Sequence, residues 1–298
     1  MSRALATFAV IALILPGCGG DDESDVGGAP SLEILDPGSE PRTQLVIRAE
    51  EGDTASSMLT LQLAIEATID DVAAPTQPVP EMSFDLTTTV EDVSETVIAT
   101  RFEYGDVEVV AQDVDPAVVE RVESTLAGFE DISGELSITP QGVFVHASVD
   151  TPDSLDPALE SMLDQVTQQF QSLTVPFPDE PVGVGASWLV KTDFEVGGIV
   201  SNLTSTYSLA DLNRDEFTLD VESEQTIEPG SLDDDVGNVV GGETTGTGTL
   251  RGSLNSLLPL KSEVSSSGNI VIEFSGPEGE SQTLDQKIDL EVRVETAR

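Results

Sequence analysis

Cysteine and histidine are nearly absent from this sequence, which contains one of each, Cys18 and His146. A single cysteine excludes an intrachain disulfide. The two residues are too few for a zinc site built from cysteine and histidine, or for a Cys-His nucleophile pair. The Gly-x-Ser-x-Gly motif of many serine hydrolases is also missing. We therefore expect no enzyme, no cofactor and no metal site, and we interpret His146 as a solvated residue on the polar side of a strand.

Basic and aromatic residues are scarce as well. Lysine and arginine number 12 against 56 aspartates and glutamates, so the formal net charge is -44. Such a chain repels nucleic acid and anionic lipid headgroups, and we expect no nucleic-acid partner. The acids are spread along the chain, which favours a solvated acidic surface suited to a salty habitat; the alternative is attraction of divalent cations or basic partners. Because aromatics make up only 4% of the residues, the core must be mainly aliphatic.

The N-terminus predicts where the protein resides. Arg3 precedes an uncharged apolar run, residues 4–15, which is too short for a permanent helix across a bilayer of ~30 Å but suits a signal peptide. The run ends in Leu15-Pro16-Gly17-Cys18, which resembles the lipobox of bacterial lipoproteins. The resemblance implies cleavage between Gly17 and Cys18 and acylation of Cys18 with lipid chains such as palmitate. The alternative is an ordinary secretory signal with an incidental cysteine.

An acylated Cys18 implies that the lipid bilayer is a partner and that the protein lies in the cell envelope. Its place there is extracytoplasmic, on the outer face of the plasma membrane or on the outer membrane. Residues 1–17 are then a lipoprotein signal peptide. Residues 18–31, rich in glycine and aspartate, have too little apolar surface to order themselves and predict a flexible acidic tether. Residues 32–298 are predicted to form a single β-rich domain.

Alternation of apolar and polar residues predicts strands through most of this domain. The clearest run is residues 59–69, where every odd position is aliphatic. Trp188 begins another alternating run and is well placed to close one end of a core. The glycines of Gly246-x-Gly248-x-x-x-Gly252 alternate with threonines, a pattern that predicts a strand and has the wrong spacing for a phosphate loop.

Two further strand predictions rest on shorter signals. Residues 45–47 are a short apolar run, and we expect a strand there. Residues 139–142 predict a turn, after which Val145 and Val149 are expected on one apolar face with His146 on the other.

Two amphipathic helices are predicted in the middle of the chain. Residues 116–127 follow Asp115, a good N-cap, and begin with proline, which suits the first helical position. Residues 157–173 repeat this opening and carry one continuous apolar stripe. We expect the stripe to pack on the chain's own sheet; the alternatives are a partner or a membrane. The residues of the stripe are Leu159, Met162, Leu163, Val166, Phe170 and Leu173.

The connections between strands are too short for parallel crossovers, so the fold class is mainly β (α+β): a large curved antiparallel sheet or half-barrel with two amphipathic helices on its concave face. This architecture, together with the lipobox, is similar to the lipoprotein-carrier superfamily. More narrowly, residues 178–188 and 246–260 resemble an uncharacterised family of bacterial secreted lipoproteins, which has no assigned activity.

Few large side chains are available to fill the apolar strand faces, so the sequence favours a carrier or binding lipoprotein with a lipid or other apolar ligand between sheet and helices. The alternative is an envelope structural or protein-interaction lipoprotein with a packed core and no ligand. The residues predicted to line the ligand are Met162, Val166, Phe170 and Trp188.

Overall fold

A computed structural model of the chain describes residues 30–75, 78–110, 114–126, 132–150, 174–196, 199–232, 237–276 and 280–297. These residues form one helix and fourteen strands, confirming the mainly β fold class. The elements are β1 (Ser31–Asp36), β2 (Thr54–Ile69), β3 (Val72–Ala73), β4 (Glu81–Val93), β5 (Ile98–Val110), α1 (Pro116–Leu126), β6 (Ser133–Ile138), β7 (Phe144–Asp150), β8 (Ser187–Val196), β9 (Ile199–Asn213), β10 (Glu216–Ile227), β11 (Gly230–Ser231), β12 (Asn238–Ser253), β13 (Lys261–Ser275) and β14 (Ser281–Thr296).

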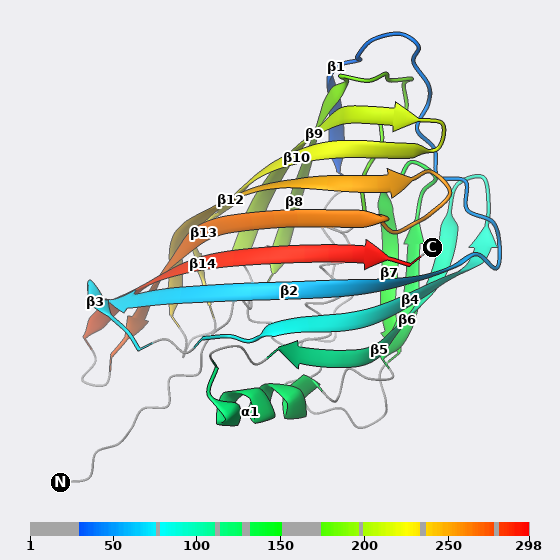
Figure 1. Cartoon of the computed structure of the whole chain (residues 1–298). Coiled ribbons are helices and arrows are strands. Elements are labelled where there is room, and N and C mark those ends of the chain that lie inside the picture. Colours follow the sequence, from blue (N-terminus) through cyan, green and yellow to red (C-terminus); the bar gives the residue numbers. More distant parts are fainter. Residues whose placement is uncertain are drawn as a thin grey trace.

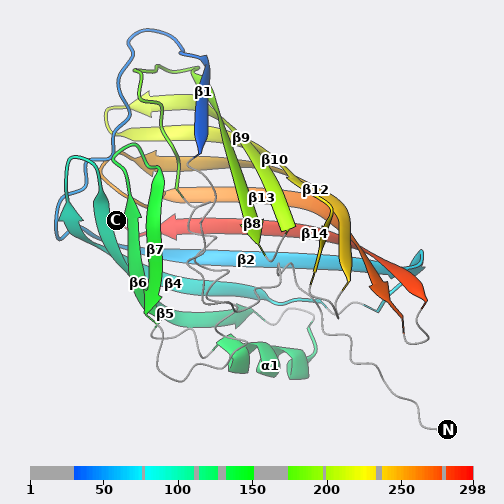
Figure 2. The same ribbon diagram turned by 180° about the vertical axis from the view of Figure 1, so that it is seen from behind.

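All the described strands belong to one antiparallel sheet, which curls strongly without closing on itself (Figures 1 and 2). Its order is β1-β8-β9-β10-β12-β13-β14-β2-β4-β5-β6-β7, with β11 beside β12 and β3 beside β2. The edges of this path are therefore β1 and β7. The sheet is antiparallel, as predicted, because most consecutive strands are joined by connections too short for a parallel crossover.

At the centre of the sheet, the last strand, β14, lies beside the second strand, β2. β14 pairs with β2 over thirteen register positions, from Leu284 beside Ile69 to Thr296 beside Ser57. Partners directly across an antiparallel pair share a face, so the odd-numbered residues of β2 lie on the same side of the sheet as the even-numbered residues of β14. The predicted alternating strand at residues 59–69 is confirmed as the second part of β2.

The inner face of the sheet carries two apolar clusters. The larger cluster contains most of the aromatic residues and surrounds Trp188, which is completely buried. The Trp188 ring stacks on Tyr207, with centroids 5.7 Å apart, and its Nε1–H donates to the Pro176 carbonyl oxygen over 2.9 Å. The smaller cluster is aliphatic and consists of Ile199, Ile227, Leu232, Val239, Ile270, Ile272 and Ile288.

Helix α1 confirms the first helix prediction. The Asp115 carboxylate accepts the backbone N–H of Ala117 at 2.8 Å, as expected of an N-cap side chain. Leu126 belongs to the larger cluster and Val122 packs against it, so one face of the helix is anchored to the core next to β5. The expected pair of helices is not found in the described part of the chain, which contains α1 alone; the second helix, predicted at residues 157–173, lies outside it.

Two local predictions are wrong. Residues 45–47 form no strand: Leu45 and Ile47 are buried, but the Ile47 N–H donates to the Pro140 carbonyl of a loop, so the segment fills the core as an extended connection. In β7 the register against β6 shifts between the partners His146 and Phe144. This bulge changes the alternation, and Val145 becomes exposed instead of facing the core.

Two other local predictions hold. The turn at residues 139–142 is present, and it includes a hydrogen bond from the Gly142 N–H to the Thr139 carbonyl oxygen. His146 is exposed, as predicted.

Candidate functional site

Most of the residues that the sequence suggested for function fall outside the described part of the chain. These are Gly17 and Cys18 of the lipobox, and Met162, Val166 and Phe170 of the predicted ligand lining. Trp188 is described, and its ring is enclosed by protein groups on β9 and the 176–177 segment. A ligand-lining role for these residues therefore stays a prediction.

A double row of aliphatic side chains crosses the inner face of the sheet along β2 and β14. The register places each β2 residue of this row directly beside one from β14, so the two strands form what we call the aliphatic ladder. Two of its members are buried and six are half-buried. The ladder consists of Leu59, Leu61, Leu63 and Ile65 opposite Val294, Val292, Leu290 and Ile288.

The aliphatic ladder connects the two apolar clusters. Leu59 and Leu61 pack against the larger cluster, whereas Leu63 and Ile65 pack against the smaller one. At a rise of about 3.4 Å per residue, these four positions span about 20 Å of the inner face. Half-buried aliphatic side chains in a continuous row are typical of a surface that another apolar group covers.

Next to the aliphatic ladder, the same face has a row of small side chains. Ser266 lies beside Leu290, and Gly246, Ser223 and Ser205 follow across β12, β10 and β9. We call these four residues the small-residue row. It offers hydroxyl groups at the level where the aliphatic ladder passes from one cluster to the other.

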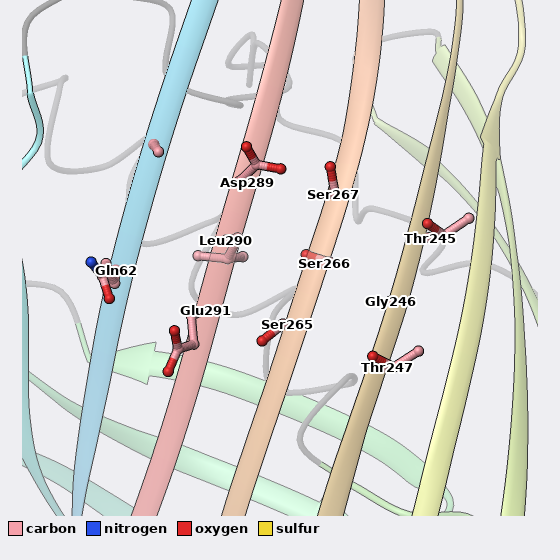
Figure 3. A pocket seen from close by; sticks show the side chains of 11 residues that line it. Gln62, Thr245, Gly246, Thr247, Ser265, Ser266, Ser267, Asp289, Leu290 and Glu291 are labelled. Atoms are coloured by element: carbon pink, nitrogen blue, oxygen red, sulfur yellow. The ribbon is translucent and has the colours of Figure 1, made fainter.

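The opposite, outer face has a hollow of about 480 Å³ over four adjacent strands, β2, β14, β13 and β12 (Figure 3). The side chains that face it come from positions alternating with the aliphatic ladder, which places them on the other side of the sheet. The functional groups of this outer-face hollow are hydroxyls, an amide and carboxylates, set among apolar atoms that form the larger part of its surface. Its lining consists of Gln62, Ala64, Thr245, Gly246, Thr247, Ser265, Ser266, Ser267, Asp289, Leu290 and Glu291.

The two carboxylates of the outer-face hollow are paired with bases on their own strand. Lys287 Nζ lies 3.1 Å from Asp289 Oδ2, and Arg293 Nε lies 3.3 Å from Glu291 Oε1. Hydrogen bonds from Ser267 and from Lys287 lower the pKa of Asp289 below its ordinary value. Asp289 is therefore a carboxylate at neutral pH, held in place as a hydrogen-bond acceptor.

Neither a metal centre nor a membrane-spanning helix is found in the described ranges. Within them, no group of three or more histidine, cysteine, aspartate or glutamate side chains is arranged to hold a metal ion. No helix among the same residues is long and apolar enough to cross a bilayer.

One family model matches the chain. Residues 161–258, about a third of the sequence, match a family of unknown function, DUF6263. The match contains residues 178–188 and most of residues 246–260, the two stretches that resemble an uncharacterised family, so the resemblance to a family without an assigned activity is supported. The match includes β8 to β12, and β8, β9, β10 and β12 are neighbours in the sheet.

Comparisons with whole proteins add little. None of the curated proteins matches the chain. Among solved structures, it is similar to in-vitro folded OmpT, an outer membrane protein of Vibrio cholerae in its trimer form, with 5% identity and a TM-score of 0.19 over 82% of this chain and 100% of that one. A similarity with so low a TM-score carries no argument.

Sequence reasoning missed the outer-face hollow. The signal was present as alternating threonine and serine at Thr245, Thr247, Ser265 and Ser267. That alternation predicts strands with a polar face, but the hollow depends on the order in which the four strands lie side by side, which the pattern does not contain.

Proposed function

We propose that this protein is a lipoprotein, anchored through Cys18 on the extracytoplasmic side of a bacterial membrane, that carries a lipid or another apolar ligand on the inner face of its sheet. The aliphatic ladder is the observation that carries the proposal. Its six half-buried side chains gain from any apolar group laid along them, and each CH₂ removed from water contributes about 0.8 kcal/mol.

The small-residue row favours a ligand with a polar end. Ser266 lies beside Leu290 of the aliphatic ladder, and Ser223 follows beyond Gly246. An acyl chain along the ladder would bring its carboxyl or ester group to these hydroxyls, where a buried polar group needs a hydrogen-bond partner. A plain hydrocarbon would leave them unused, so an amphipathic lipid fits better.

The finer parts of the proposal come from the sequence. The apolar stripe of residues 157–173 suits a second helix over the concave face, and the resulting arrangement would be similar to the lipoprotein-carrier superfamily. The half-buried state of Leu61 and Leu63 fits a face that receives further apolar groups. The proposal includes no catalysis.

The anchor and the carrier are tested separately. Cys18→Ala should remove palmitate labelling and move the protein from the membrane fraction to the soluble fraction, because acylation needs the thiol. Membrane retention with no change in labelling would refute the anchor. This result says nothing against ligand binding, which is measured on the purified chain.

The carrier is tested by native mass spectrometry of protein purified from membranes and by uptake of a fluorescent fatty acid. Leu63→Asn places an amide in the aliphatic ladder and should weaken uptake about tenfold or more. Glu66→Asn, on the exposed opposite face of the same strand, is the matched control and should change nothing. Far-UV circular dichroism checks that both variants fold. A ligand-free mass with no uptake by the unaltered protein would sink the proposal.

A specific observation favours the alternative, an envelope structural or protein-interaction lipoprotein with a packed core. The space enclosed between Phe177, Phe217, Leu250 and Leu258 is only about 20 Å³. That space holds about one water molecule, which needs roughly 10–15 Å³ of such room, and it is far too small for an acyl chain. This alternative predicts a ligand-free mass and protein partners that co-purify.

A further inference from the structure

The outer-face hollow is separate from the surface proposed to carry lipid. The side chains of Asp289 and Glu291 face the hollow, whereas those of Ile288 and Leu290 belong to the aliphatic ladder; Leu290 is the one ladder residue that also lines the hollow. Its volume of about 480 Å³ lies within the ~300–1,000 Å³ typical of small-molecule sites. Four long hydrogen-bonded strands form its floor, so its side chains are held on rigid elements before any ligand arrives.

The outer-face hollow carries more hydrogen-bonding side chains than a typical small-molecule site, although apolar atoms still form the larger part of its surface. It has no aromatic side chain, and the positions that alternate with the aliphatic ladder provide four hydroxyls, the Gln62 amide and two carboxylates. Hydroxyls and amides both donate and accept hydrogen bonds, whereas carboxylates only accept. A ligand that satisfies this set must itself carry many groups that both donate and accept.

The charges of the outer-face hollow exclude strongly ionic ligands. Lys287 pairs with Asp289, and Arg293 pairs with both Glu81 and Glu291, so a metal cation would have to compete with an ammonium or a guanidinium group at each carboxylate. An anion would approach against a net charge of -44. What remains is an uncharged ligand rich in hydroxyl groups.

We propose that the outer-face hollow binds a neutral saccharide, with Asp289, Glu291 and Gln62 accepting hydrogen bonds from its hydroxyls and the threonine and serine hydroxyls on β12 and β13 completing the contacts. Because no aromatic ring is present to stack on the sugar, the affinity is weak, with a Kd on the order of 1 mM.

The test uses the full chain purified in detergent. Maltose, cellobiose and N,N′-diacetylchitobiose, three neutral disaccharides, are titrated by saturation-transfer difference NMR. The double variant Thr247→Val, Ser265→Ala removes two neighbouring hydroxyls that the register pairs across β12 and β13. It should weaken binding about fivefold or more. Thr249→Val changes the next outer-facing position of the same strand, outside the hollow, and should leave binding unchanged.

The proposal is overturned by any of three results: no saturable binding of the three sugars, binding that the double variant leaves unchanged, or displacement of the bound sugar by low concentrations of Ca²⁺, which would indicate a cation site. Circular dichroism of both variants separates loss of binding from loss of fold. Fatty-acid uptake is measured on the same samples. The lipid proposal can fail while the saccharide proposal stands, and the reverse also holds.

Discussion

Trp188 offers the sharpest test of how the core is packed. It is completely buried, its ring stacks on Tyr207, and its indole N–H donates to the Pro176 carbonyl oxygen. Phe177 lies on another side of it, with ring centroids 6.5 Å apart. Truncation to alanine removes the ring and leaves a cavity among groups that cannot all collapse into it.

The magnitude follows from these contacts. Trp188→Ala should lower the free energy of unfolding by about 3–5 kcal/mol, the range for large aromatic residues in cores. Trp188→Phe keeps an aromatic ring but leaves the Pro176 carbonyl without its donor, which costs about 1–3 kcal/mol. In a domain of this size, each kcal/mol changes Tm by about 2–4 °C, so the alanine variant should melt about 6–20 °C earlier.

The assay is urea unfolding followed by far-UV circular dichroism, since both variants lack the chain's only tryptophan as a fluorescent probe. Leu35→Ala is the control: Leu35 is 52% exposed, and its truncation should change stability by less than about 0.5 kcal/mol. If Trp188→Ala were as mild as Leu35→Ala, the packing described for Trp188 would be wrong. If Trp188→Phe kept full stability but lost ligand uptake, Trp188 would line a ligand instead of filling the core.

Three further predictions concern backbone fit, ionisation and charge. Gly183→Ala should lower the free energy of unfolding by about 1–3 kcal/mol, because the added Cβ would overlap the Ser39 carbonyl oxygen. The control is Gly105→Ala, whose added Cβ would meet only an ordinary contact and should change stability little. Equal urea midpoints for the two variants would contradict this prediction. Burial raises the pKa of Tyr207 to about 12, compared with a pKa of about 10 in the unfolded chain. The contribution of the buried Tyr207 to the free energy of unfolding is therefore complete below about pH 10 and is lost as the pH rises through 12. Phenolate absorbance would reveal ionisation near pH 10 if this were wrong. Raising NaCl from about 0.05 M to about 0.5 M should increase Tm, because the salt screens the repulsion within a chain of net charge -44. This gain should outweigh the weakening of exposed ion pairs, which are worth about 0–1 kcal/mol each. A lower Tm at the higher salt concentration would refute the prediction.

Much of the fold was predictable because its signals are local. Alternation over residues 59–69 predicted β2, and the Asp115-Pro116 opening predicted where α1 begins. The burial of Trp188 also followed from the pattern. Local patterns gave the wrong secondary structure where tertiary contacts determine the backbone conformation. Leu45 and Ile47 are apolar because they fill the core, yet the Ile47 N–H bonds to a loop, so they form no strand.

The candidate sites were less predictable than the strands. Alternation assigns a side chain to one of two faces, but it does not say which strand lies beside which. The bulge next to His146 shows how one irregular position reverses the faces, because Val145 then points outward. The aliphatic ladder and the outer-face hollow both need strand order and register, which the pattern leaves open.

Both candidate sites lie across the pairing of β2 with β14, which we call the seam. Binding at either site therefore depends on completion of the fold. The seam joins Leu59 to Val294, so residues near the two ends of the domain must meet before it exists. Contacts of such long sequence separation form slowly, because the loop entropy is lost before the contact stabilises the chain. Half of the aliphatic ladder comes from β14, as do Asp289 and Glu291 of the outer-face hollow. A chain without β14 would lose the lipid surface and the saccharide site together, whereas a change at Leu63 should affect only the first and a change at Gln62 only the second.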